Sequence, residues 1–331
     1  MQYTNTTNIP LILAVWLAAD NGYDLVPHPD TVSATGLMKP VRSIVLSRRV
    51  ATNLVSTDIA DMVPAKLGTA VHTAVEEAWL YHRDQALHNL GVPPQIAAKI
   101  VLNPDPGQVL PDDAIVIHME QRTAKMITVD DKDWTVSGKF DAVVEQTVED
   151  VKTTKTYNWI KGSNDVKYGL QGSIYRWLNP EIIIEDHINI LMIFTDWSPL
   201  KAKADPTYPQ KRVIVKKVPL MSLEETESWI RAQLTNLHRY LDKSQEELPQ
   251  CTPEELWMDP PKWAYYKDKT KLVRATKLFD NAPEANLKLA QDGNKGLIVK
   301  RDMEPRFCRY CPAVSVCTQA EGYIAQGILQ L

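Results

Sequence analysis

The sequence lacks an apolar run long enough to cross a membrane. Its longest, IPLILAVWLAA over residues 9–19, has eleven residues, whereas a spanning helix needs roughly 20. No basic segment precedes the run, so it does not fit a signal peptide either. It predicts a buried helix, and we expect a cytoplasmic protein that has no membrane partner.

The chain also lacks an excess of positive charge. Its 37 Lys and Arg residues stand against 41 Asp and Glu residues, which gives a net charge of −4. This balance excludes a globally basic nucleic-acid binder, so any such contact must use a local patch. With 331 residues, of which 44% are hydrophobic, the chain can bury a large core in one elaborated domain or in one domain plus a small module.

Cysteine is absent from the first three quarters of the chain. The four cysteines are Cys251, Cys308, Cys311 and Cys317. In a reducing compartment, clustered thiols more often bind a metal or an iron–sulfur cluster than form disulfides. From residue 249 onward, proline, charge and tryptophan alternate. We therefore expect a main domain over residues 1–248, including an N-terminal helical part, and a C-terminal metal-binding or iron–sulfur-binding module over residues 249–331.

The first half of the main domain predicts one long helix and then a group of strands. An apolar side favours a helix over residues 67–81, and residues 93–108 are rich in turn formers and predict a surface excursion. Alternating polar and apolar residues then predict a meander of four strands. These strands are expected over residues 114–120, 125–129, 134–145 and 148–154.

Helices and strands then alternate. Residues 168–178 predict a helix, residues 187–195 a buried strand and residues 212–218 one more strand. Ser222 and Glu225 have the spacing of a capping box at the start of a long helix. The buried stripe of that helix is expected at Trp229, Ile230, Leu234, Leu237 and Leu241. The pattern as a whole predicts an α/β fold.

Two acids and one lysine stand out in the strand-rich region. Asp150 and Lys152 lie two apart on a predicted strand, so they share a face. A hairpin turn at residues 145–147 could bring Asp141 beside them. Asp141, Asp150 and the carbonyl of Val151 are oxygen ligands of the kind that Mg²⁺ or Mn²⁺ prefers. Lys152 could orient a water, and this combination suits phosphodiester hydrolysis. The alternative is a surface hairpin with a solvated Asp–Lys pair.

A second candidate element lies on the predicted helix at residues 67–81. His72 and Glu76 are four apart and share a face. His72 could be a further metal ligand, and Glu76 could bind the metal through water or anchor the histidine. A histidine on a mostly apolar helix is, however, more often a satisfied core residue. Glu120, at the end of a predicted strand, is a weaker candidate.

Two further pairs are candidates for contacts with nucleic acid. Gln171 and Tyr175 share a face of the helix that follows the Asp-x-Lys strand, where glutamine could contact phosphate and tyrosine could stack. Tyr175 could equally be an ordinary packing residue. Arg48 and Arg49 lie in a basic turn.

Taken in order, Gly68…His72…Glu76, Gly138…Asp141, Asp150-Val151-Lys152 and Gln171…Tyr175 resemble the PD-(D/E)XK nucleases. The resemblance is closest to the RecB-type branch of this superfamily, which includes phage exonucleases. It covers about half of the chain. The resemblance implies a restriction-endonuclease-like core with a central mixed β-sheet flanked by helices. It also implies His72, Asp141 and Asp150 as metal ligands and Lys152 as the catalytic lysine. The segment Leu46-Ser47-Arg48-Arg49 resembles one found in phage-encoded members, in which the arginines could grip phosphates.

The cysteines resemble the same branch. The spacing of Cys308, Cys311 and Cys317 matches the C-terminal cysteines of RecB-type nucleases that hold a 4Fe–4S cluster, and Cys251 would be the fourth ligand. The chain departs from the family here, because the first cysteine usually precedes the histidine motif. That departure leaves Zn²⁺ open as the alternative, since four thiolates also suit tetrahedral zinc.

The resemblance implies a DNA exonuclease that uses Mg²⁺ or Mn²⁺. It further implies a phage-encoded protein that acts in the host cytoplasm, in recombination or replication, beside a single-strand annealing protein. The alternatives are an endonuclease and a non-catalytic DNA-binding or assembly protein. The intact Asp141, Asp150 and Lys152 argue against the non-catalytic alternative.

Overall fold

The computed structural model describes residues 2–19, 28–50, 56–162, 164–301 and 303–331. The chain divides into two compact units. The larger unit consists of Gln2–Met38 with Ser56–His238, and the smaller unit consists of Lys39–Val55 with Arg239–Leu331. The predicted boundary between a main domain and a C-terminal module at residue 249 stays a prediction.

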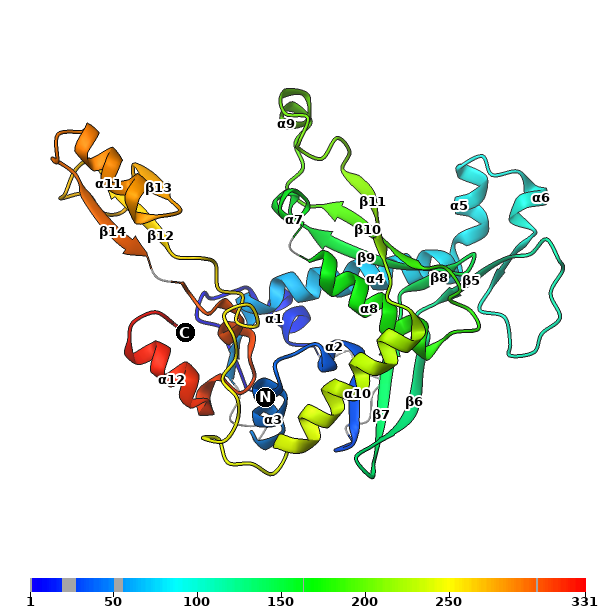
Figure 1. Cartoon of the computed structure of the whole chain (residues 1–331). Helices are drawn as coiled ribbons and strands as arrows, with labels where there is room; N and C mark the ends of the chain where they lie inside the picture. The colour runs from blue at the N-terminus through cyan, green and yellow to red at the C-terminus, as the bar shows by residue number, and fades with distance from the viewer. Residues whose placement is uncertain (1, 20–27, 51–55, 163, 302) are drawn as a thin grey trace. The chain divides into compact units, whose positions relative to one another are not determined.

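The larger unit is built on a six-stranded mixed sheet with the strand order β11-β10-β9-β8-β5-β4 (Figure 1). The pairs β9–β10 and β4–β5 are parallel, and the other neighbours are antiparallel. The strands are β4 (Ile100–Leu102), β5 (Ile115–Met119), β8 (Ala142–Val144), β9 (Thr147–Thr154), β10 (His187–Phe194) and β11 (Val213–Pro219).

The alternation of side chains along β9 and β10 gives this sheet a buried face. Asp150 pairs with Ile190 and Lys152 pairs with Met192, so the acid and the lysine share the face of these apolar residues. Ile190 and Met192 are buried, and so is Asp150 at 1% exposure. The acid–lysine pair therefore lies on the core side of the sheet.

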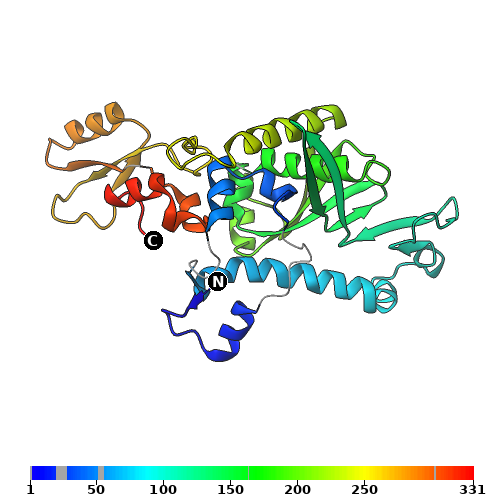
Figure 2. The ribbon, with the colours of Figure 1, turned by 90° about the horizontal axis from the view of Figure 1, so that it is seen from below.

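Helices cover both faces of the sheet (Figure 2). The helix α8 (Asp165–Leu178) packs on the face of Asp150, and α4 (Val63–Tyr81) contacts β9 on the other face, where Gly68 lies next to Thr153. The helix α10 (Leu223–Tyr240) contacts α8, because Trp177 Nε1 of α8 donates a 3.1 Å hydrogen bond to Glu227 of α10. The prediction of an α/β fold with a central mixed sheet flanked by helices is confirmed.

The meander prediction is wrong, because the expected strands belong to two sheets. The strands β2 (Thr31–Ser33), β7 (Lys132–Lys139) and β6 (Arg122–Val129) form a separate sheet in the order β2-β7-β6. The chain leaves this sheet at Phe140 and enters the central sheet at β8. A Cβ atom on Gly138 would lie 2.7 Å from Leu178 Cδ1, so the glycine lets α8 pack directly on β7.

The β8–β9 hairpin turns where the sequence predicts it. Val144 pairs with Thr147, and the two residues between them have left-handed φ angles, 46° at Glu145 and 67° at Gln146. Two-residue hairpin loops favour such angles because they match the twist of the strands. The capping box is confirmed as well. Ser222 N donates to Glu225 Oε2 at 2.8 Å, and Glu225 N donates to Ser222 Oγ at 3.1 Å.

The apolar run near the N-terminus forms α1 (Leu11–Ala18), but it is not a buried helix. Leu17 is buried, whereas Leu11 is 79% and Ile12 is 83% exposed. The run is apolar all round the helix, and only one side of it can pack on η2 (Ile59–Met62). None of the described helices combines the length and the apolar content that a membrane span needs.

The remaining elements of the larger unit are short. The residues predicted as a surface excursion contain β4, which pairs with β5 at the edge of the central sheet. The sequence does not predict this strand, because three residues are too few to show a strand period. The other elements are β1 (Gln2–Thr4), α2 (Ala34–Leu37), β3 (Ser56–Asp58), α5 (Arg83–Asn89), α6 (Pro94–Ala97), α7 (Thr156–Lys161) and α9 (Pro199–Ala204).

The smaller unit holds a helix from early in the chain together with the C-terminal region. A three-stranded antiparallel sheet in the order β13-β12-β14 carries one helix, α11. The elements of this unit are α3 (Val41–Arg49), β12 (Lys262–Tyr266), β13 (Lys277–Phe279), α11 (Ala282–Gln291), β14 (Leu297–Arg301), η3 (Arg306–Tyr310), η4 (Val314–Val316) and α12 (Thr318–Ala325).

Candidate metal centre

Asp141 is fixed between the two sheets by the backbone of β9. The residue follows the end of β7, and its Oδ2 accepts a 2.8 Å hydrogen bond from the Val151 N–H. The bond holds the Asp141 carboxylate beside the strand that carries Asp150 and Lys152. The predicted approach of Asp141 to this strand is therefore present in the structure.

Asp150 and Lys152 form a close ion pair. Oδ2 of Asp150 lies 2.5 Å from Nζ of Lys152, and among the described residues this buried oxygen has no aligned hydrogen-bond donor. Burial raises the pKa of Asp150 to about 6, against the opposing effect of the lysine charge. Burial lowers the pKa of Lys152, but the negative charges of Asp150 and Asp141 outweigh it, so the pKa is raised and Lys152 is an ammonium ion.

A histidine from α4 and an acid from the end of β5 complete a group of possible ligands. One ligand atom from each of His72, Glu120 and Asp141 lies within 4.8 Å of the other two. Nδ1 of His72 is 3.2 Å from Asp141 Oδ2 and 3.9 Å from Glu120 Oε1. The hydrogen bond to Asp141 raises the pKa of His72.

Glu120 reaches the site through an unusual backbone conformation. Its φ is 51°, in the left-handed region that few non-glycine residues adopt, and its N–H donates to the Asp141 carbonyl at 2.9 Å. Burial raises the pKa of Glu120, although Lys139 Nζ lies 2.9 Å from its Oε2 and opposes the shift. The sequence makes Glu120 a weaker candidate, because the end of a strand could equally carry an exposed edge charge. In the structure its side chain is only 14% exposed and reaches the site through this single turn of the chain.

Gln171 connects α8 to the acid pair. Its Nε2 donates to Asp150 Oδ1 at 3.3 Å and to Tyr175 Oη at 2.8 Å. Gln171 and Tyr175 therefore share one helix face, as their spacing predicts, and Gln171 is the one of the two that contacts Asp150. Their predicted contact with DNA stays a prediction.

Glu76 lies one helical turn beyond His72 and outside the group of close ligand atoms. Its negative charge lies near enough to Glu120 to contribute to the raised pKa of that acid. This position is compatible with the predicted role of Glu76, which stays a prediction. The same holds for the metal-ligand role predicted for the Val151 carbonyl.

The donor set fits a hard divalent cation. It offers carboxylate oxygens from Glu120 and Asp141, the imidazole of His72 and a buried Asp150 oxygen without an aligned donor. Mg²⁺ and Mn²⁺ prefer oxygen ligands, and imidazole suits several transition metals. The nearby ammonium of Lys152 supplies a positive charge that an anionic substrate would face.

In the smaller unit, all four cysteines line one pocket together with Arg42, Ser43 and Leu46 of α3. Nε of Arg42 donates to Cys317 Sγ at 3.2 Å, and Ser43 Oγ lies 3.3 Å from Cys311 Sγ. Burial raises the pKa of Cys251 to about 12 and that of Cys308 to about 11. A metal would have to displace these protons, because thiolates are the binding form.

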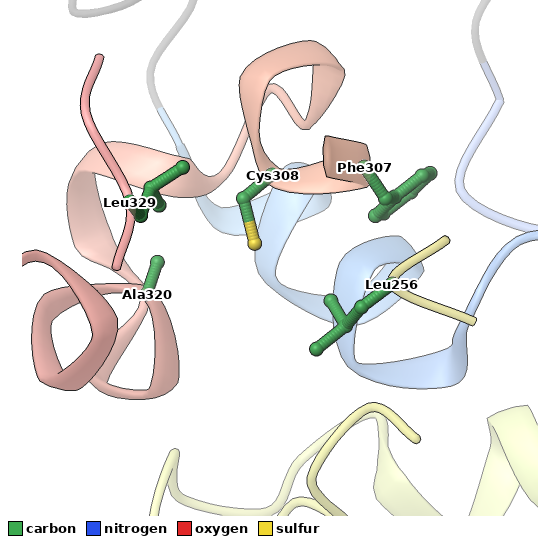
Figure 3. Close-up of a cluster of buried hydrophobic side chains, with 5 residues drawn as sticks. All are labelled: Leu256, Phe307, Cys308, Ala320 and Leu329. Atoms are coloured by element: carbon green, nitrogen blue, oxygen red, sulfur yellow. The ribbon is translucent and has the colours of Figure 1, made fainter. Parts of the chain in front are cut away.

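The thiols sit against an apolar cluster in which Cys308 packs near Leu256, Phe307, Ala320 and Leu329 (Figure 3). No three of the four cysteine sulfurs, all in the described part of the chain, lie within 4.8 Å of one another. Tetrahedral zinc with Zn–S bonds of about 2.3 Å holds its sulfurs about 3.8 Å apart. A 4Fe–4S cluster spaces its thiolates more widely, because each thiolate binds a different iron.

The two candidate phosphate-binding arginines belong to the last turn of the helix α3, and not to a turn between elements as predicted. Nη2 of Arg49 donates to the carbonyl oxygens of Leu241 at 2.8 Å and Lys243 at 2.7 Å. Arg49 therefore binds residues 241–243 of its own unit, and Arg48 is exposed. Their contact with DNA stays a prediction.

No protein-family model matches the chain, and no curated protein matches it. Solved structures that show a distant likeness include the following two. SSO0001 is 16% identical with a TM-score of 0.40, and the match covers 70% of this chain and 86% of that protein. A phage-related exonuclease from Haemophilus somnus 129PT is 13% identical with a TM-score of 0.27, and the match covers 66% of this chain and 96% of the exonuclease.

Proposed function

We propose that the chain is a metal-dependent DNA nuclease with a restriction-endonuclease-like core. The observation that carries the proposal is the Val151–Asp141 hydrogen bond, which brings Asp141 to the Asp150–Lys152 pair while His72 contacts Asp141 from α4. Two carboxylates, an imidazole and an ammonium thus converge from separate elements of the larger unit. A solvated surface pair would not bury Asp150 at 1% exposure.

In this proposal Asp141, Asp150 and His72 hold Mg²⁺ or Mn²⁺, and Glu120 stands beside them as a further carboxylate. When bound, the metal supplies a water of lowered pKa and neutralises charge on the phosphate. Gln171 orients the Asp150 carboxylate through its hydrogen bond.

Lys152 acts as a cation in the proposed reaction. Because its pKa is raised, its ammonium can donate hydrogen bonds to the attacking water or to a phosphoryl oxygen, but it cannot accept a proton. Its positive charge would stabilise the negative charge that develops on the phosphate in the transition state.

Within the nuclease class we favour an exonuclease. The resemblance of the sequence motifs to phage exonucleases supports this choice, together with a phage origin and a role in recombination or replication. The partners would be DNA and a single-strand annealing protein, in the cytoplasm of the host.

We also propose a 4Fe–4S cluster, with Zn²⁺ as the alternative, at Cys251, Cys308, Cys311 and Cys317. The pocket that the four cysteines share and the resemblance of their sequence spacing to that of RecB-type nucleases support this proposal. The N–H of Arg42 faces Cys317 and would stabilise a thiolate there.

Digestion of end-labelled linear DNA and closed circular DNA, with Mg²⁺, Mn²⁺ or EDTA, tests the nuclease proposal. The informative variant is Asp150→Asn. The matched control is Glu149→Gln, since Glu149 is the adjacent acid on β9, points to the opposite face and contacts Asn189 instead.

We expect the wild type and the Glu149→Gln variant to degrade linear DNA only with metal, and the Asp150→Asn variant to leave it intact. Sparing of the circle would identify an exonuclease, and cutting of the circle an endonuclease. Absence of cleavage by the wild type with either metal would contradict the proposal and favour a non-catalytic DNA-binding role.

A further inference from the structure

The smaller unit contains a strongly basic segment within an acidic chain. Residues 262–301, which we call the basic module, hold ten Lys and Arg residues against four Asp and Glu residues, a net charge of +6. Since the whole chain has a net charge of −4, the rest of it carries −10. Positive charge is therefore concentrated in one short segment.

The basic module is folded around a small core of its own. The strands β12, β13 and β14 form an antiparallel sheet, and α11 packs on it (Figure 1). Tyr265, Phe279 and Ala285 are buried between sheet and helix. The lysines and arginines lie outside this core, so they are not needed to form it.

Each acid of the module is already engaged within the module. Asp280 pairs with Lys262, and Asp292 pairs with Lys288 at 2.9 Å and accepts from Tyr265 Oη at 2.6 Å. Glu284 accepts a 2.8 Å hydrogen bond from Asn281 at the start of α11. These acids stabilise local structure and leave most of the positive charge uncompensated.

The uncompensated charge is densest in the β12–β13 connection, residues 267–276, which we call the basic loop. Its four cations, Lys267, Lys269, Lys271 and Arg274, are all exposed. Lys271 lies 3.9 Å from Asp268, the one acid of the loop. Lys269 and Arg274 form no ion pair with any carboxylate in the described part of the chain.

Local hydrogen bonds give the basic loop a defined shape. Asp268 Oδ1 accepts from Thr270 N at 2.9 Å and from Thr270 Oγ1 at 2.7 Å. Across the loop, Lys267 N donates to Thr276 Oγ1 at 3.1 Å, and Thr276 N donates to the Tyr265 carbonyl at 2.8 Å. A preorganised loop loses less conformational entropy on binding.

Two apolar residues stand among these cations. Val273 is 98% exposed and Leu272 is 45% exposed. Cations of this kind contact phosphates, and apolar side chains can enter a groove of the duplex. An anionic membrane would also attract the charges, but two apolar side chains bury little area in a bilayer.

We propose that the basic loop binds the phosphate backbone of duplex DNA, as a contact separate from the candidate metal centre. The choice of DNA as the polyanion rests on the proposed nuclease function, whereas the location of the contact rests on the charges and exposure of the loop. Binding through the loop would hold the duplex without reading its sequence.

The test is the affinity of the full chain for a fluorescently labelled duplex, measured in EDTA by anisotropy between 50 and 200 mM salt. The loop variant carries Lys269→Gln, Lys271→Gln and Arg274→Gln. The control carries Arg83→Gln, Lys99→Gln and Lys243→Gln, which remove the same charge from cations with carboxylate partners at 3.0, 2.9 and 3.3 Å. Circular dichroism confirms the fold of both variants.

We expect the loop variant to bind at least about tenfold more weakly at low salt, with a log–log salt slope shallower by about 2–3. The control should keep the wild-type slope. An unchanged slope in the loop variant would overturn the proposal. So would a loss of binding to phosphatidylserine vesicles with unchanged DNA binding, which would identify the loop as a membrane contact.

Adding Mg²⁺ or Mn²⁺ to the same duplex separates the two proposals. If the loop variant binds DNA as tightly as the wild type and cleaves it, the nuclease proposal stands and the proposed DNA contact of the basic loop is rejected. If the loop variant binds DNA more weakly but the wild type does not cleave it, the proposed DNA contact of the basic loop stands and the nuclease proposal is rejected.

Discussion

The backbone N–H of Val151 donates a 2.8 Å hydrogen bond to Oδ2 of Asp141. The bond ties the carboxylate that follows β7 to the strand that carries Asp150 and Lys152. It lies where the chain crosses from one sheet to the other, so the position of Asp141 depends on the pairing of β8 with β9.

Because of this bond, the effect of the negative charge of Asp141 can be tested separately from the effect of its hydrogen-bonded position. Asp141→Asn retains an oxygen acceptor for the Val151 N–H but removes the negative charge. We expect cleavage with Mg²⁺ to slow by at least about 10²-fold, while the melting temperature stays close to that of the wild type. Asp141→Leu removes both features and should also lower the free energy of unfolding by about 1 kcal/mol. Wild-type cleavage by Asp141→Asn would show that the charge has no role.

Gln171 is predicted to position Asp150. Gln171→Leu should slow cleavage by about 10- to 100-fold. Because the lost hydrogen bond stabilises the charged form of Asp150, the acidic limb of the pH–rate profile should move to higher pH. The control is Tyr175→Phe, which keeps the Gln171–Asp150 bond and should leave that limb in place. A Gln171→Leu profile with the wild-type acidic limb would assign the residue to packing alone.

The raised pKa of Asp150 predicts a pH-dependent stability of the metal-free protein. The folded-state pKa is about 6 against an ordinary value of 3.8, so the folded state holds this proton more tightly than the unfolded state. Stability therefore falls as pH rises from about 4 to 6. The amide of Asp150→Asn does not titrate. The free energy of unfolding of this variant, relative to that of the wild type, should therefore rise by on the order of 3 kcal/mol across this window. Urea unfolding of both proteins in EDTA from pH 4 to 7 measures the difference, and a flat difference would contradict the burial argument.

Removal of one cysteine should empty the proposed cofactor site. We expect the anaerobically purified wild type to be brown and to contain iron, and Cys311→Ser to lose most of this absorbance and to unfold at a lower temperature. Metal analysis by mass spectrometry accompanies the spectra. A colourless wild type with stoichiometric zinc would reject the iron–sulfur proposal in favour of Zn²⁺.

Arg42 is predicted to be a main support of the smaller unit. Arg42 is 4% exposed. Its guanidinium donates to Thr318 Oγ1 at 2.8 Å, to the Gln245 carbonyl at 3.1 Å and to Cys317 Sγ at 3.2 Å. Arg42→Met leaves several buried acceptors without donors, so it should lower the free energy of unfolding by about 3 kcal/mol or more. Arg48→Met, at an exposed position of the same helix, is the control and should change it by less than about 1 kcal/mol. Denaturant titration of both variants tests this comparison.

Local patterns in the sequence predict those features that depend on near neighbours. Ser222 and Glu225 cap α10 because they are three residues apart at a helix start. Asp150 and Lys152 share a face because side chains alternate along a strand. The β8–β9 turn follows from the short stretch between two strand patterns. Burial along β10 follows from its apolar composition.

Features that depend on distant pairing are not visible in local patterns. The expected meander divides into two sheets, because strand periodicity does not say which strands will pair. The apolar run of α1 is mostly exposed, because burial needs a partner surface that composition cannot provide. Glu120 reaches His72 only through its left-handed φ and its backbone bond to Asp141. Arg42 meets Cys317 across a separation of 275 residues, since packing of the folded chain, and not sequence spacing, brings α3 to the C-terminal cysteines.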